Sequence, residues 1–167
     1  HVGTDGNLIA YDKDGNILFS WDLHSGNDSV TGVYIRQFGP DGVAPANDVE
    51  IDATGPIWDG DTYVVGLANG GYAVLYVVSS QAFVQLIGVP DLPPVGKISA
   101  GSGTITGLSG APLTDGGFVV LVSRWPAKKV YFRRIYAAGH KTGQEVYVGH
   151  YGAATVIEPH TQTPPAD

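Results

Sequence analysis

The sequence contains no cysteine and no methionine among its 167 residues, and only 15% of its residues are charged. Without cysteine, the chain has no disulfide framework, no thiolate metal site and no cysteine nucleophile. No apolar run approaches the roughly 18 residues of a membrane span, and no stretch joins helical periodicity to a capping signature. These absences predict an all-β protein that is held together by packing alone.

Basic residues are also few: nine Lys and Arg stand against 16 Asp and Glu, which gives a net charge of −7. A nucleic-acid partner is not expected, because such binding needs a basic footprint that displaces counterions from phosphates. Positive charge is nevertheless concentrated in the last third of the sequence, at Arg124, Lys128, Lys129, Arg133, Arg134 and Lys141. An anionic glycan or an acidic surface on a neighbouring subunit would suit this region.

Glycine is abundant, with 24 residues, and it marks a turn that recurs three times. The segments DGN at 14–16, NGG at 69–71 and DGG at 115–117 align, and each is followed by an apolar, β-branched or aromatic run. Asn-Gly and Asp-Gly tolerate the positive φ angles of tight hairpins. Each segment therefore predicts a strand, a turn and a second strand.

A third and a fourth strand are predicted in each copy. Segments 32–38, 82–89 and 130–136 align as third strands, and the register of the first and last copies continues so that Val49 matches Val146 and Ile51 matches Val148. Repeats of about 45 to 55 residues with four antiparallel strands are typical of propeller blades. We predict one all-β domain of propeller-like blades, with a β-trefoil as the alternative fold. Its units are expected at about 6–52, 61–100 and 107–150, followed by a C-terminal strand or tail at 151–167.

The repeat can be written as L-x-[DN]-G-G-[FY]-x-V, a variable loop, V-Y-x-R-x-[FI], and G-x(5)-[DE]-V. This pattern resembles the repeats of very large secreted bacterial proteins of the RTX, calcium-binding adhesin type, over residues 6–51, 63–100 and 108–148. The resemblance implies an extracellular, repeat-built module with an adhesive or scaffolding role. The middle copy lacks the arginine and glycine of the pattern, and the nonapeptide calcium repeat of those proteins is missing from the sequence. Calcium binding in their manner is therefore not supported.

Three blades pose a geometric problem, because closed propellers typically have about four to eight blades and an open array exposes edge strands. A homo-oligomer, or a larger assembly joined through edge strands, is therefore expected. The C-terminal segment AATVIEPHT resembles the first strand of a further unit, which would close a ring or pair with a neighbouring chain. A β-trefoil would close without a partner.

The acidic turn that contains Asp12, Asp14 and Asn16 is the candidate metal site, because it offers the carboxylate and amide oxygens that calcium prefers. The turn lacks the downstream glutamate of an EF-hand, and Asp, Asn and Gly are favoured in any hairpin. The five histidines form no metal-binding motif and fall in predicted loops or tails, so they are expected to be solvated. No cofactor is expected, and calcium is the one candidate.

Two tryptophans are candidate ligand-binding residues. Trp58 and Trp125 lie in predicted loops beside glycine, proline and charged residues, where their flat rings could contact a sugar. Trp21 and Tyr76, in contrast, share one repeat position within a predicted strand and are expected in the core.

Two arginines are candidate ligand-binding residues as well. Arg36 and Arg133 occupy the same position in the first and third repeats, and Gln85 occupies it in the second. They are predicted to line a shared face, with paired outward-facing strand residues as the alternative.

An enzyme is not expected, because the sequence has neither a G-x-S-x-G elbow nor a phosphate-binding loop. Asp48, Glu50 and Asp52 alternate along one predicted strand, which indicates a solvent-facing side. The sequence thus predicts a non-enzymatic, extracellular structural or adhesive module that self-associates or joins a larger surface assembly. A carbohydrate-binding module is the alternative, and a glycoside hydrolase with paired carboxylates from different loops is the third hypothesis.

Overall fold

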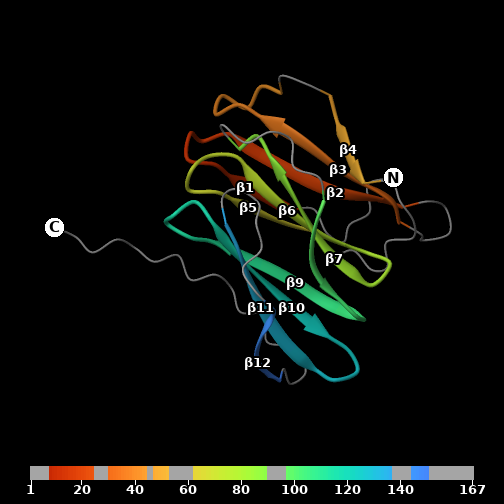
Figure 1. Ribbon diagram of the computed structural model, residues 1–167. Helices are drawn as coiled ribbons and strands as arrows, with labels where there is room; N and C mark the ends of the chain where they lie inside the picture. The colour runs from red at the N-terminus through yellow and green to blue at the C-terminus, as the bar shows by residue number, and fades with distance from the viewer. Residues whose placement is uncertain are drawn as a thin grey trace.

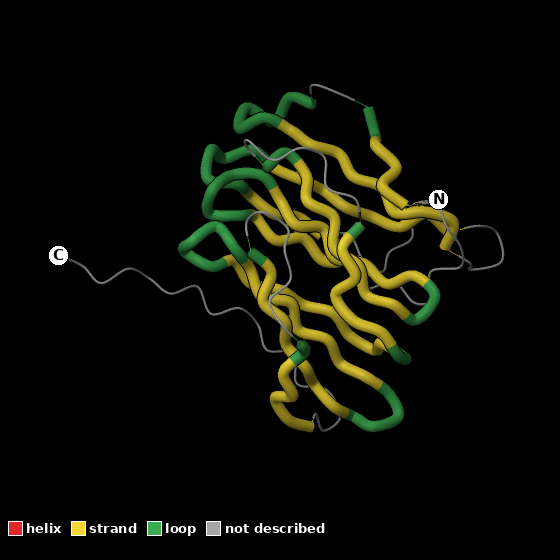
Figure 2. The backbone as a smooth tube through the Cα atoms, in the orientation of Figure 1, coloured by secondary structure: helices red, strands yellow, loops and turns green. Residues whose placement is uncertain are grey.

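The computed structural model describes residues 8–24, 30–44, 47–52, 62–89, 97–136 and 144–150. These residues form twelve strands in three four-stranded antiparallel sheets (Figure 1), and the described part of the chain contains no helix (Figure 2). The described residues therefore form no helix that could cross a membrane. The predicted all-β fold of three four-stranded repeats is confirmed. The expected strand or tail at 151–167 lies outside the described residues.

Each sheet is formed by consecutive strands. Sheet 1 consists of β1 (Leu8–Tyr11), β2 (Ile17–His24), β3 (Val30–Phe38) and β4 (Val49–Asp52). Sheet 2 consists of β5 (Tyr63–Gly66), β6 (Tyr72–Val78), β7 (Gln81–Ile87) and β8 (Ile98–Ser102). Sheet 3 consists of β9 (Ile105–Pro112), β10 (Phe118–Arg124), β11 (Lys129–Ile135) and β12 (Val146–His150).

The same turn joins the first two strands of every sheet. A backbone N–H before the turn donates to a carbonyl oxygen four residues later, at 2.8 to 3.0 Å: Asp12 to Asn16, Leu67 to Gly71 and Leu113 to Gly117. Each turn contains a glycine with a positive φ, namely 78° at Gly15, 98° at Gly70 and 82° at Gly116, and Gly71 is a second such glycine in the middle repeat at 76°. Such angles strain residues with a Cβ, and this explains why the repeated Asn-Gly and Asp-Gly pairs predicted the hairpins correctly.

The three sheets are arranged like propeller blades, with their first strands adjacent: β1 contacts β5, and β5 contacts β9 (Figure 1). Gly66 permits the first of these contacts, since a Cβ at this position would lie 1.8 Å from the carbonyl oxygen of Tyr11. All strand pairs lie within one repeat. A β-trefoil shares a barrel among its repeats, so this alternative does not describe the fold.

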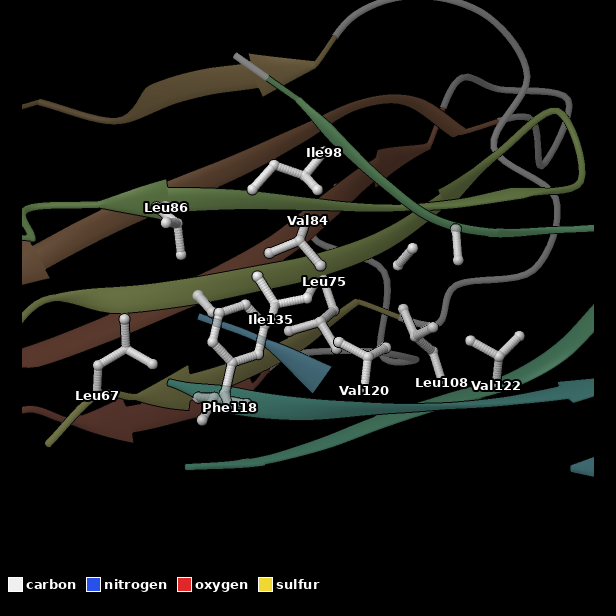
Figure 3. Close-up of a cluster of buried hydrophobic side chains, with 14 of the residues drawn as sticks. Leu67, Leu75, Val84, Leu86, Ile98, Leu108, Phe118, Val120, Val122 and Ile135 are labelled. Carbon is white, nitrogen blue, oxygen red and sulfur yellow. The ribbon is translucent and has the colours of Figure 1, made fainter. Parts of the chain in front are cut away.

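Two apolar cores lie between the sheets, and sheet 2 contributes to both. Leu75 and Val84 pack with Phe118 and Val120 of sheet 3 (Figure 3), whereas Tyr76 packs toward sheet 1. All seven residues of β6 are buried as a result. Strand β6 therefore has the continuous apolar pattern of a strand that is covered on both faces.

The fourth strand of sheet 1 departs from the predicted solvent-facing alternation. Asp48 and Glu50 are exposed as expected, but Asp52 is buried. The register between β3 and β4 shifts, because Tyr34 pairs with Glu50 while the preceding Val33 pairs with Asp52. This β-bulge breaks the two-residue period and places the Asp52 carboxylate 2.6 Å from Nζ of Lys97, the residue before β8.

Candidate functional site

Aromatic and basic side chains gather where the turn between β10 and β11 meets the end of β12. We call this group the sheet 3 aromatic–basic cluster; it comprises Arg124, Trp125, Lys128, Lys129, Tyr131, Tyr147 and His150. Strand register brings its members together, because Lys129 pairs with both Arg124 and His150, and Tyr131 pairs with Tyr147. A register shift at Val130 and Tyr131 adds a bulge beside the cluster, a feature that often re-aims side chains near functional sites.

Three rings of the cluster form a connected group. Tyr131 and Tyr147 have ring centroids 5.8 Å apart at 61°, and Tyr147 and His150 have centroids 5.6 Å apart at 78°. Tyr147 Oη lies 2.7 Å from His150 Nδ1. Trp125 and Tyr147 expose 52% and 48% of their surfaces. Two large rings are therefore accessible at one end of sheet 3.

A cation lies near each of these rings. Lys128 Nζ is 5.6 Å from the Trp125 ring centroid, and Lys129 Nζ is 5.7 Å from that of Tyr147. Neither lysine has an ion pair with a carboxylate of the described residues. Both ammonium groups are thus able to meet the charge of a ligand that contacts the rings.

Arg124 has a different role, because its charge is already paired. Its guanidinium lies 4.5 Å from the Tyr131 ring centroid and donates to both carboxylate oxygens of Glu145, at 2.5 and 2.6 Å. Both bonds come from the one Nη2 atom, and charge-assisted hydrogen bonds of this kind restrict the geometry of both side chains. The Arg124–Glu145 pair therefore orients Tyr131, against which Tyr147 packs.

The four ligand-binding candidates from the sequence do not form one site. Trp125 belongs to the cluster, and Trp58 lies outside the described residues. Arg36 is 3.5 Å from Asp48 on the face of sheet 1 that points away from sheet 2, whereas Arg133 donates to the Ser99 carbonyl oxygen at 3.3 Å between sheets 2 and 3. The arginines occupy equivalent positions on different sheets, so the predicted shared face is wrong.

Sequence reasoning grouped Lys129 with the basic residues of the third repeat, but it did not place Tyr147 and His150 beside Trp125. His150 was expected in a loop, but it ends strand β12. The concentration of basic residues in the third repeat was the available signal. Combining it with the register of the fourth strand would have pointed to Tyr147.

The acidic turn of sheet 1 uses its candidate calcium ligands in its own hydrogen bonds. Asp12 Oδ1 accepts the N–H groups of Asp14 and Asn16, each at 2.9 Å, and Oδ2 accepts Asn16 Nδ2 at 2.8 Å. Burial raises the pKa of Asp12, but the bonds from Asn16 and Asp14 outweigh it and hold the pKa below its usual value. The described residues contain no group of three or more metal-binding side chains, and calcium at this turn stays a prediction.

A second polar group lies inside the interface of sheets 1 and 2. Lys97 Nζ is 2.6 Å from Asp52 Oδ2 and 4.7 Å from the Phe83 ring centroid, and Tyr76 Oη is 3.5 Å from Gln85 Oε1. Burial raises the pKa of Tyr76, and the negative charge of Asp52 raises it further. Because Asp52 and Tyr76 are both enclosed, this group stabilises the interface of sheets 1 and 2.

The chain has a distant structural likeness to a protein of known structure. No family model matches the chain, and no curated protein matches its sequence. Among solved structures, the chain is similar to a protein provisionally named as a gluconolactonase, with a TM-score of 0.40 and 13% sequence identity. The similarity covers 80% of this chain and 44% of that protein, so this chain spans less than half of its length.

This finding contradicts the function expected from the sequence. The similar protein is named as an enzyme, whereas we expected a non-enzymatic structural or adhesive module that self-associates or joins a surface assembly. The expectation of a structural or adhesive role is wrong and is not carried further. At a TM-score of 0.40 and 13% identity, the likeness transfers neither a lactonase activity nor a substrate to this chain, because function depends on the residues of a site rather than on a shared fold.

Proposed function

We propose that the chain binds a negatively charged carbohydrate at the sheet 3 aromatic–basic cluster. One observation carries this proposal: the exposed rings of Trp125 and Tyr147 each have a lysine Nζ within 6 Å, at 5.6 and 5.7 Å, and neither lysine is paired with a described carboxylate. Exposed aromatic rings give flat apolar platforms for the C–H faces of sugars. The adjacent ammonium groups supply the complement to a uronic acid carboxylate or a sulfate.

The charge of the whole chain makes the local arrangement selective. With a net charge of −7, the molecule repels polyanions except where Lys128 and Lys129 dominate the surface. Binding should therefore weaken as salt screens this attraction, whose range is about 8 Å at physiological ionic strength. The extracellular location expected from the sequence belongs to the same proposal, because it would give access to surface polysaccharides.

The exposed rings of Trp125 and Tyr147 should contribute to the affinity for the carbohydrate. Trp125→Ala and Tyr147→Ala should each weaken binding to polygalacturonate by about fivefold, since loss of one aromatic contact is worth about 1 kcal/mol. Isothermal titration calorimetry measures this change, with neutral dextran as the comparison ligand. Tyr136→Ala is the matched control, because Tyr136 is 45% exposed and lies 4.9 Å from the Arg134 guanidinium at the other end of sheet 3.

Substitution of the two lysines distinguishes a site for a charged glycan from an aromatic surface that binds nonspecifically. Lys128→Gln together with Lys129→Gln should weaken the binding and reduce its salt dependence, whereas Lys13→Gln, at an exposed lysine paired with Asp14, should change neither. Equal affinities for the Trp125→Ala, Tyr136→Ala and unaltered chains would refute the proposal. Analysis of the recovered polysaccharide tests the separate prediction that the chain is not an enzyme, because hydrolysis would release shorter products.

A further inference from the structure

Sheet 1 has an apolar face that points away from sheet 2. Cross-strand pairs place Ile9, Phe19 and Arg36 on this side, and Trp21 beside Tyr34. The Trp21 and Tyr34 rings stack at 6.1 Å and 19°, and Phe19 and Phe38 contact edge to face at 5.3 Å. We call this surface the open face of sheet 1; it comprises Ile9, Tyr11, Ile17, Phe19, Trp21, Tyr34, Arg36 and Phe38. Ile9 is 47% exposed and Phe19 is 38% exposed, so a large apolar surface meets solvent.

The repeats show what normally covers such a face. Aligned on their common turn, Ile17, Phe19 and Trp21 correspond to residues that are at most 1% exposed in the other two sheets: Tyr72, Val74 and Tyr76 in sheet 2, and Phe118, Val120 and Val122 in sheet 3. In both cases the preceding sheet covers them. Sheet 1 carries the same face, but the described residues contain no sheet before it.

Sheet 3 lies at the other end of the array, and the described residues contain no sheet after it. Its face away from sheet 2, which we call the open face of sheet 3, comprises Val119, Leu121, Val130, Phe132 and Val146. The register places Leu121, Phe132 and Val146 on this one side, and Val146 is 49% exposed. The residues equivalent to Val119 and Leu121 are fully buried against a following sheet: Leu18 and Ser20 in sheet 1, and Ala73 and Leu75 in sheet 2.

The two open faces are therefore the two halves of an interface that the chain already forms twice internally. Their units also carry opposite charge. Residues 8–52 contain eight Asp and Glu against two Lys and Arg, while residues 105–150 contain two Asp and Glu against six Lys and Arg. Opposite charge on the two ends favours a contact between unlike ends and disfavours contacts between like ends.

We propose that a second copy of this chain docks its open face of sheet 3 onto the open face of sheet 1, and that two such contacts close a ring of six sheets. Six sheets fall within the typical range of about four to eight blades, and the closed ring leaves neither open face in solvent. The contact uses faces in place of the edge strands expected from the sequence. Lys129 and Tyr131 point to the other side of sheet 3 from Val130 and Phe132, so the carbohydrate proposal is independent.

Sedimentation velocity across a dilution series tests the docking. The unaltered chain should sediment as a dimer of the 17.5 kDa chain and should dissociate on dilution, more readily at high salt. Phe19→Asp or Ile9→Asp on sheet 1, and Val146→Asp on sheet 3, should each shift the chain to monomer. Val43→Asp is the matched control, because Val43 is 62% exposed outside both faces, and this variant should remain dimeric.

A mixing experiment distinguishes unlike-end docking from a symmetric contact of one face with itself. Phe19→Asp retains an intact sheet 3 face and Val146→Asp retains an intact sheet 1 face, so an equal mixture should form a heterodimer although each variant alone is monomeric. Circular dichroism with an unchanged β spectrum shows that each variant is folded. A monomeric unaltered chain at all concentrations, a dimer that survives both variants, or a mixture that stays monomeric would each overturn the proposal.

Discussion

Two buried tyrosines of sheet 2 couple the stability of the fold to pH. Burial raises the pKa of Tyr72, and the nearby charge of Asp12 raises it further; burial and then Asp52 have the same effect on Tyr76. In the unfolded chain both hydroxyls ionise near the ordinary value of about 10. The folded chain therefore keeps protons that the unfolded chain loses, so the free energy of unfolding falls as the pH rises above about 10.

This linkage predicts that Tyr72 and Tyr76 ionise only well above the ordinary pKa of a tyrosine, together with unfolding. Ultraviolet absorbance of tyrosinate and circular dichroism, recorded on the same samples, measure the two events. Tyr76→Phe should move alkaline unfolding to higher pH, whereas Tyr136→Phe, at an exposed ring, should not. Ionisation of all nine tyrosines before any loss of β structure would contradict this assignment.

The direction of a single side chain was predictable from the repeat, but its burial was not. Tyr76 was expected in the core and is fully buried. Trp21 occupies the same repeat position and was also expected in the core, yet it is only partly buried. The pleat decides which face a residue points to. Burial depends in addition on a neighbouring sheet, which sheet 1 lacks on that side among the described residues.

At the scale of elements, the fold depends on how closely β1 approaches β5. A Cβ at Gly66 would lie 1.8 Å from Tyr11 O and 2.8 Å from its carbonyl carbon, and both are backbone atoms that no rotamer change can move. Gly66→Ala should therefore lower the free energy of unfolding by about 3 kcal/mol, the upper part of the range for overpacking.

Urea denaturation measures this cost, and β12 supplies the control. Gly149 is also a strand glycine, but a Cβ there would meet no atom within 4 Å. Gly149→Ala should change stability by less than about 0.5 kcal/mol. If both variants unfold at the same urea concentration as the original chain, the close approach of β1 and β5 is not a determinant of stability.

Strand order within each sheet followed from the sequence because turns and strand patterns are local signals. The bulge between β3 and β4 did not, because a bulge inserts one residue without changing the composition of the strand. This one residue reverses the direction of Asp52 and creates the ion pair with Lys97. The sheet 3 aromatic–basic cluster was not predicted for a related reason. Its members lie in the turn after β10 and in strands whose side chains meet only because of the pairing register.

At the scale of the whole molecule, stability is expected to fall from the centre of the array to its ends. The sequence showed three similar units, and nothing in their patterns alone distinguishes the environment of the middle one. Among the residues that the structure describes, sheet 2 is covered on both faces and sheets 1 and 3 on one each. In repeat arrays each unit is stabilised mainly by its neighbours, so the end sheets should open more often.

Hydrogen exchange should reveal this gradient strand by strand. Amides of β6, whose seven residues are all buried, should exchange most slowly, and those of the largely exposed β12 most rapidly. If a second copy covers the open faces, protection of β2 and β10 should rise with protein concentration while that of β6 stays constant, because β6 is already covered within one chain. Equal protection of β6 and β12 at every concentration would mean that the three sheets unfold as one cooperative unit. The interfaces between sheets would then have to contribute as much to stability as the contacts within each sheet.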